Sequence, residues 1–170
     1  EASPVITSDA GGTSAAVSVA ENTKAVTTVT ATDADTGATL AYSITGGADS
    51  AKFTLNSTTG ALSFITAPNY EAPNDAGTNN VYDVTVQVSD GSNTDSQAIA
   101  VSVTNVNEAS PVITSDAGGT AAAVSVAENT KAVTTVTATD ADTGATLAYS
   151  ITGGADSSMF TLNSTTGALS

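Results

Sequence analysis

The chain has 170 residues, of which 17 are acidic and three are lysine, with no arginine, histidine or cysteine, so its formal net charge is −14. This charge excludes nucleic acid as a backbone-bound partner, because such binding needs basic patches, and it disfavours anionic membrane surfaces. The lack of cysteine excludes zinc–thiolate sites, thiol catalysis and disulfides.

Short segments rich in Val, Ile and Thr alternate with Gly, Asn, Asp and Ser turns from the start of the chain, which is typical of a sandwich or barrel. In chain order, the predicted strands are 4–7, 15–20, 25–32, 38–45, 52–56, 61–66, 81–89 and 96–105. In 81–89 the apolar residues Tyr82, Val84, Val86 and Val88 share one face. No helical periodicity competes. The sequence therefore predicts an all-β, immunoglobulin-like Greek-key sandwich, with 67–80 as its longest loop.

After the strand at 96–105 the sequence starts again. Residues 108–170 repeat residues 1–63 at an offset of 107, and only Ser14/Ala121, Ala51/Ser158 and Lys52/Met159 differ. We therefore assign a complete repeat to 1–107 and the N-terminal part of a second, near-identical repeat to 108–170. Between them, Pro111 fixes its own φ and biases Ser110 toward an extended backbone, which predicts a short, stiff linker.

The partial copy has no counterpart of 81–89 and 96–105, which carry the best alternating apolar faces of the repeat. We expect residues 108–170 to expose part of their core and to present open strand edges. The completing strands would come from a continuation of the chain or from a neighbouring chain that donates residues equivalent to 64–107.

Six short motifs follow one another along the first repeat and its linker. They are Ala20-Glu21-Asn22, Asp33-Ala34-Asp35, Gly47 through Phe53 to Thr59-Gly60, Asn69-Tyr70-Glu71, Ser89-Asp90-Gly91, and Asn105-Val106-Asn107-Glu108-Ala109-Ser110-Pro111. In this order and at these spacings they resemble the motifs of cadherin repeats, including bacterial cadherin-like domains of large adhesins. The resemblance implies tandem cadherin-like sandwiches that bind Ca²⁺ where two repeats meet.

Carried over position by position, the resemblance implies three sets of calcium ligands. They are Glu21 and Glu71 at the base of the first repeat, Asn107 and Glu108 in the linker with the carbonyls of Val106 and Ala109, and Asp140 and Asp142 in the second repeat. Asp33, Asp35 and Asp90 would serve a junction to a preceding repeat. Calcium prefers six to eight oxygen ligands, and aspartates at i and i+2 of an extended segment point the same way.

The sequence departs from the family pattern at four positions, where Asn69 and Asn105 replace aspartates, Glu108 replaces an aspartate and Ala109 replaces an asparagine. Each loss of charge weakens the local site, so we expect two or three ions at a junction. Taken singly, the Asp33 segment also reads as a polar turn and Glu21 as a solvated strand end. Other side chains lie outside the motifs: we interpret Asp9, Asp49, Asp75, Asp83 and Asp95 as solvated, and Phe53 and Tyr82 as core.

The composition favours structure over catalysis, because general acid–base catalysis usually recruits histidine and a nucleophilic hydroxyl needs an adjacent base. A glycosidase-like carboxylate pair stays open on spacing alone, but we expect no enzyme. The leading hypothesis is a calcium-rigidified extracellular stalk or spacer of a long cell-surface or secreted adhesin, whose partners are neighbouring repeats. The alternative is a repeat of a self-assembling extracellular filament or matrix, joined homotypically by strand complementation between chains.

Overall fold

The computed structural model describes residues 1–170, which divide into two compact units, Glu1–Val106 and Asn107–Ser170. Nearly all the regular structure is β-strand, which confirms the predicted all-β class. The only helices are two 3-10 turns, η1 (Ser50–Lys52) and η2 (Ser157–Met159). Neither has the length or the apolar character that crossing a membrane requires.

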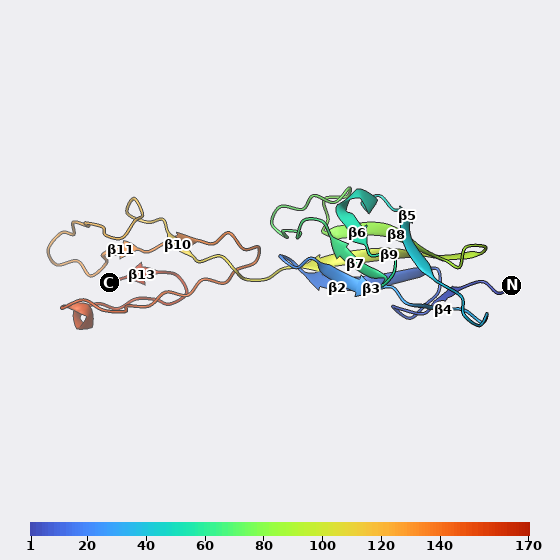
Figure 1. Ribbon diagram of the computed structural model, residues 1–170. Coiled ribbons are helices and arrows are strands. Elements are labelled where there is room, and N and C mark those ends of the chain that lie inside the picture. Colours follow the sequence, from blue (N-terminus) through green and yellow to red (C-terminus); the bar gives the residue numbers. More distant parts are fainter. The chain divides into compact units, whose positions relative to one another are not determined.

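Unit 1 is a sandwich of two sheets (Figure 1). The larger sheet has the order β2-β9-β8-β5, built from β2 (Ser14–Ala20), β9 (Thr94–Thr104), β8 (Val81–Ser89) and β5 (Ala41–Gly46). The smaller sheet has the order β3-β7-β6, built from β3 (Ala25–Thr28), β7 (Ala61–Phe64) and β6 (Phe53–Leu55). The strands β1 (Val5–Ile6) and β4 (Ala31–Thr32) form a separate antiparallel pair.

The predicted strands lie close to the observed ones, with one correction. The segment 25–32 is two strands instead of one, because its first half pairs with β7 in the smaller sheet whereas β4 pairs with β1. The strand predicted at 81–89 has the bounds of β8. β8 pairs antiparallel with β9 and with β5, and β2 runs parallel to β9.

The core of unit 1 lies between the two sheets, and β8 and β9 supply its centre. On β8 the alternating residues Tyr82, Val84, Val86 and Val88 are at most 1% exposed, as the period of two predicts. Phe53 and Phe64 stack at 4.6 Å, and Phe64 meets Tyr82 edge to face at 5.1 Å. The core positions predicted for Phe53 and Tyr82 are therefore confirmed.

Unit 2 contains only four short strands, β10 (Val112–Ile113), β11 (Thr134–Thr135), β12 (Ala138–Thr139) and β13 (Ala168–Leu169). They form the pairs β10-β12 and β11-β13, which repeat β1-β4 and β3-β7 of unit 1. Residues 121–127 and 148–153, the counterparts of β2 and β5, are not strands. In unit 1 those strands pair only with β9 and β8, and 108–170 has no counterpart of either. Exposed apolar side chains, including Val126 and Phe160, confirm the predicted opening of the core.

Candidate metal sites

Glu21 lies at the point where the chain leaves β2, and it is only 2% exposed. Its Oε2 accepts a hydrogen bond of 2.8 Å from the N–H of Tyr70, and its Oε1 accepts one of 2.8 Å from the N–H of Val106. One carboxylate therefore ties together the end of β2, the loop before β8 and the end of unit 1. The interpretation of Glu21 as a solvated strand end is wrong.

The electrostatics of Glu21 favour its charged form. Burial of the carboxyl would by itself raise its pKa, but the N–H donors of Tyr70 and Val106 outweigh that effect. The pKa of Glu21 is therefore lowered from its ordinary value of 4.5. Hydrogen bonds to a carboxylate favour ionisation in this way, so Glu21 is available as an anionic oxygen ligand at neutral pH.

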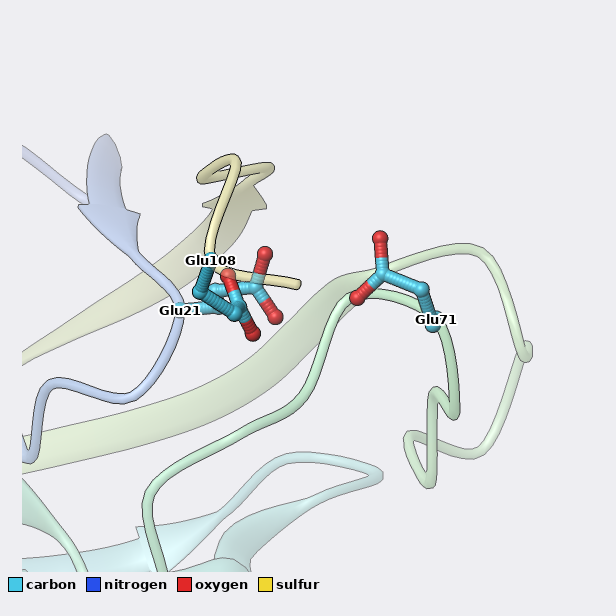
Figure 2. A group of neighbouring side chains, drawn as sticks. All are labelled: Glu21, Glu71 and Glu108. Carbon is cyan, nitrogen blue, oxygen red and sulfur yellow. The ribbon is translucent and has the colours of Figure 1, made fainter. Parts of the chain in front are cut away.

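Two further carboxylates gather at Glu21. Glu71 and Glu108 each bring one oxygen into a group in which all three ligand atoms lie within 4.8 Å of one another. In Figure 2 the carboxylates of Glu21 and Glu108 lie side by side, and Glu71 faces them from the loop between β7 and β8. Three like charges at this spacing repel one another, and a divalent cation with carboxylate ligands removes that repulsion. We call Glu21, Glu71 and Glu108 the acidic trio.

A second acidic group lies on unit 1 and contains Asp33, Asp35 and Asp90. The N–H of Asp35 donates to Oδ1 of Asp33 at 2.7 Å, and the N–H of Ala2 donates to Oδ2 of Asp35 at 2.7 Å. Asp35 and Asp90 line one surface hollow together with Glu1. The chain therefore brings the three predicted aspartates to one region of the unit, although Asp90 is far from the others in sequence.

Two oxygen atoms of this second group have no hydrogen-bond donor. Oδ2 of Asp33 and Oδ2 of Asp90 are both enclosed and without a partner. Buried polar atoms are almost always paired, and a carboxylate oxygen can be satisfied by a cation as well as by a donor. Oδ1 of Asp90 accepts from the N–H groups of Asn93 and Ser92, and these bonds lower the pKa of Asp90. The donor set is made only of carboxylate oxygens, which fits calcium.

Unit 2 repeats the part of the second acidic group that involves Asp33 and Asp35. The N–H of Asp142 donates to Oδ1 of Asp140 at 2.9 Å, and the N–H of Ala109 donates to Oδ2 of Asp142 at 2.8 Å. These bonds match those of Asp33, Asp35 and Ala2, residue for residue. Asp142 is 6% exposed and is held by the residue that directly follows Glu108. The linker residue Asn107 is exposed, and its role as a ligand stays a prediction.

The interpretation of Asp49 and Asp75 as solvated is wrong. Asp49 and Asp75 are each 3% exposed. The Asp49 carboxylate accepts from the N–H groups of Ala76 and Asp83, at 2.7 and 2.9 Å. The Asp75 carboxylate accepts from two N–H groups of its own loop, at 3.0 and 3.1 Å. These carboxylates shape the loop before β8, and no local sequence signal distinguishes them from surface aspartates.

Comparison with known proteins gives a consistent family assignment. The family profile of the cadherin domain matches residues 15–107. Human Protocadherin Fat 1 is 32% identical over 136 residues, a match that covers 77% of this chain and 3% of that protein. The chain therefore spans only a small part of the length of the curated relatives that it matches.

Solved structures share the architecture. The extracellular cadherin domains 3–6 of Protocadherin Gamma B2 match with a TM-score of 0.70 and 23% identity, covering 99% of this chain and 42% of that one. The cis-dimer structure of Protocadherin gammaB7 EC3-6 matches with a TM-score of 0.68 and 24% identity. This match covers 99% of this chain and 42% of that one. At these identities the likeness shows the fold alone.

Proposed function

Because this chain belongs to the cadherin family, as the match over residues 15–107 shows, we propose that it is a calcium-stiffened stalk or spacer of a long adhesin. Membership makes it an extracellular, β-sandwich adhesion repeat. The proposal adds the role of calcium, the residues that bind it, and the place of the chain in a longer array. Near-identity of the two copies supports such an array, since neither copy has diverged toward a separate task.

The observation that carries the calcium proposal is the pair of enclosed carboxylate oxygens without a donor, Oδ2 of Asp33 and Oδ2 of Asp90. Together with Asp35 they would hold calcium at a junction with a preceding repeat. The acidic trio would hold it at the junction inside this chain, with Asn107, the carbonyls of Val106 and Ala109, and the pair Asp140 and Asp142. Calcium supplies positive charge between groups that otherwise repel.

Two of the proposed calcium ligands already bind the backbone of the linker by hydrogen bonds. Glu21 accepts from the N–H of Val106, and Asp142 accepts from the N–H of Ala109. The linker backbone is therefore bonded to a proposed ligand on each side of Glu108. When these carboxylates are also bound to cations, bending the linker would break several bonds at once. In this way the acidic residues would convert two units into a rod.

Calcium titration of the full chain tests the proposal. Ligands that bind only the native state add about 2.7 kcal/mol at 100 times Kd, so millimolar calcium should raise the melting temperature, and chelator should reverse the gain. Small-angle scattering should show a more flexible molecule in chelator. If chelator changes neither stability nor flexibility, the calcium proposal is wrong.

A double variant, Asp140→Asn with Asp142→Asn, separates the joint from the core. It should loosen the joint in calcium, as seen in scattering, while unit 1 melts as before in chelator, because both substitutions lie outside unit 1. Unfolding of unit 1 by this double variant would contradict the assignment. We also propose that the binding partners of this chain are neighbouring repeats of the same protein.

A second candidate function is a self-assembling extracellular filament or matrix, joined by strand complementation between chains. Under this candidate the strands of another copy, instead of a continuation of this chain, would cover the apolar side chains of unit 2, where Val126 is 52% and Ile113 50% exposed. The cis-dimer of Protocadherin gammaB7 is a precedent for homotypic contact in a similar fold. Concentration-dependent growth of the full chain into polymers, measured by light scattering, would support this candidate, and a monomer at all concentrations would contradict it.

A further inference from the structure

The two sheets of the sandwich in unit 1 end in four edge strands, β2 and β5 in the larger sheet and β3 and β6 in the smaller one. An edge strand presents unpaired N–H and C=O groups, and proteins usually protect it by a short length, a bulge, a charged residue or a proline. Three of these edges have such protection. β6 has only three residues, β3 has a register shift between Ala25 and Thr27, and β5 has one between Ile44 and Gly46.

β2 has none of these protective features. It has seven residues, Ser-Ala-Ala-Val-Ser-Val-Ala, without a charge or a proline. It pairs with β9 from Ser14 opposite Ala98 to Ala20 opposite Thr104 with no shift in register. The edge is open although β9, β8 and β5 complete the sheet on the other side of β2. β2 is therefore a long, regular and uncharged edge in a chain whose net charge is −14.

Backbone hydrogen bonds show which residues of β2 face away from β9. The N–H of Ala98 donates to the carbonyl oxygen of Thr13 at 2.9 Å, and the N–H of Glu21 donates to the carbonyl oxygen of Thr104 at 3.0 Å. Successive residues of a strand point their N–H and C=O groups to opposite sides, so the residues at odd positions bond β9. The residues that point away from β9 are Ser14, Ala16, Ser18 and Ala20. Their backbone groups make no hydrogen bond within the chain, and we call these groups the free edge of β2.

The side chains beside the free edge are small and neutral. All four of its residues are serine or alanine, and all four are exposed. Val17, on the opposite face of β2, is half-buried and packs against the core. Glu21, the charged residue that directly follows β2, is only 2% exposed. A strand that approaches the free edge therefore meets no bulky or charged side chain of β2.

We propose that the free edge of β2 pairs with the free edge of β2 in a second copy of this chain, so that the two larger sheets join into one continuous sheet. No strand is exchanged and unit 1 stays closed, which distinguishes this contact from strand complementation. The inference also goes beyond the calcium-stiffened stalk, because the contact is at a sheet edge of unit 1 and not at a junction between repeats.

A second copy fits because β2 is complementary to itself when the two strands run antiparallel. With Val17 opposite Val17, Ser14 lies opposite Ala20 and Ala16 lies opposite Ser18, so that each outward N–H meets an outward C=O. The two Val17 side chains meet on the core face, where a pair of β-branched residues adds contact. Such a contact is isologous, as in most closed dimers.

Charge also favours this edge over the rest of the surface. Two copies that each carry a net charge of −14 repel one another, and the repulsion is least where neither surface carries a charge. Salt screens the repulsion, whereas the hydrogen bonds of the free edge join neutral groups. Association should therefore tighten as salt increases.

Sedimentation velocity of the full chain, from low micromolar to millimolar concentration, tests the pairing. The experiment is run in chelator, so that a failure of the calcium proposal does not affect it. One strand-to-strand contact buries a small area, so we expect a weak dimer that tightens with salt. A monomer at every concentration would overturn the proposal. Association that weakens with salt would also overturn it, because opposite charges would then be the cause.

Amide hydrogen exchange resolved by residue locates the contact. In the dimer, exchange at Ala16 and Ser18 should slow by a factor of about ten or more, because their N–H groups gain acceptors. Exchange at Val17 and Val19 should change less, because their N–H groups face β9 in the monomer as well. Association without slower exchange at Ala16 and Ser18 would place the contact elsewhere and refute the pairing.

Two substitutions of Ala16 provide a matched pair. Ala16→Pro removes an outward N–H but no bond to β9, and an edge strand tolerates proline in this orientation. Ala16→Thr keeps the N–H and favours a strand. The first should weaken the dimer about tenfold or more, with unit 1 still folded by circular dichroism, and the second should retain it. Equal association of the two variants would contradict the proposal.

A third variant keeps the proposal testable if Ala16→Pro unfolds unit 1. Ser18→Lys places a charge beside the free edge, which blocks edge pairing, although it also lowers the net negative charge of the chain. We expect it to weaken the dimer. A dimer strengthened by Ser18→Lys would show that net charge controls the association, and the proposed pairing of β2 would be wrong.

Discussion

Substitution of Glu71 by glutamine should have opposite effects on stability without and with calcium. The ligand oxygens of the acidic trio lie within 4.8 Å of one another. At 4.8 Å, the upper limit of these separations, two unit charges repel by about 0.9 kcal/mol in a water-like dielectric, and by more in a less polar one. Glu71 is half-buried and Glu108 exposed, so the water-like figure applies to that pair, whereas it is a lower limit for Glu71 and the buried Glu21. With two neighbours, Glu71→Gln should relieve about 1–2 kcal/mol in chelator.

With calcium the sign should reverse. The variant loses one carboxylate ligand, and each tenfold loss of affinity removes about 1.4 kcal/mol of the calcium-dependent stabilisation. Glu71→Gln is therefore expected to be more stable than the unmodified chain in chelator and to gain less from calcium. The gain in chelator should fade as salt is added, because the repulsion is screened.

Urea denaturation at low salt is the suitable assay, since guanidinium would screen the charges under study. Far-ultraviolet circular dichroism follows the unfolding of the sandwich, with and without calcium. Asp83→Asn is the matched control: it removes the same charge from an exposed position of β8 outside the acidic trio. If Glu71→Gln destabilises the chain equally in chelator and in calcium, Glu71 supports the fold and is not a ligand. If Asp83→Asn reproduces its effects, net charge alone explains them.

Three further predictions concern unit 1. At Gly47, with φ +100°, an added Cβ would lie 2.4 Å from Cα of Val84 on β8. Gly47→Ala should therefore destabilise unit 1 by about 3 kcal/mol or more, from the left-handed backbone and the overlap with β8; a loss of only about 1–2 kcal/mol in denaturation, the cost of the backbone alone, would refute the overlap. The pKa values of Glu21 and Asp90 are lowered, so the stabilisation from each carboxylate is present above its ordinary pKa, 4.5 for Glu21 and 3.8 for Asp90, and is lost as the pH falls below that value; a melting temperature insensitive to acid would contradict this. Asp49→Ala leaves two backbone N–H groups without an acceptor and should cost about 2–6 kcal/mol by urea denaturation; a loss below 1 kcal/mol would show that water replaces the carboxylate.

Much of the architecture could be predicted from local patterns in the sequence. The alternation in 81–89 places Tyr82 and Val86 on one face whatever the partner strand is, because successive side chains of a strand point to opposite sides. The offset of 107 identifies the repeat, and the spacing of Asp33 and Asp35 places their side chains on the same side of the chain. These properties depend on neighbours in sequence, so composition and spacing are sufficient to predict them.

The long-range partners were decided only by the tertiary structure. Glu21 and Val106 are 85 residues apart, and nothing near Glu21 in sequence indicates that it bonds that backbone N–H. Asp49 and Asp75 resemble surface aspartates in sequence, yet both are buried because β8 and its preceding loop close over them. The counterparts of β2 and β5 in unit 2 have almost the same sequence as in unit 1 but are not strands. A strand is held by hydrogen bonds to a partner elsewhere in the chain, so even an identical segment takes its structure from residues that its own sequence does not contain.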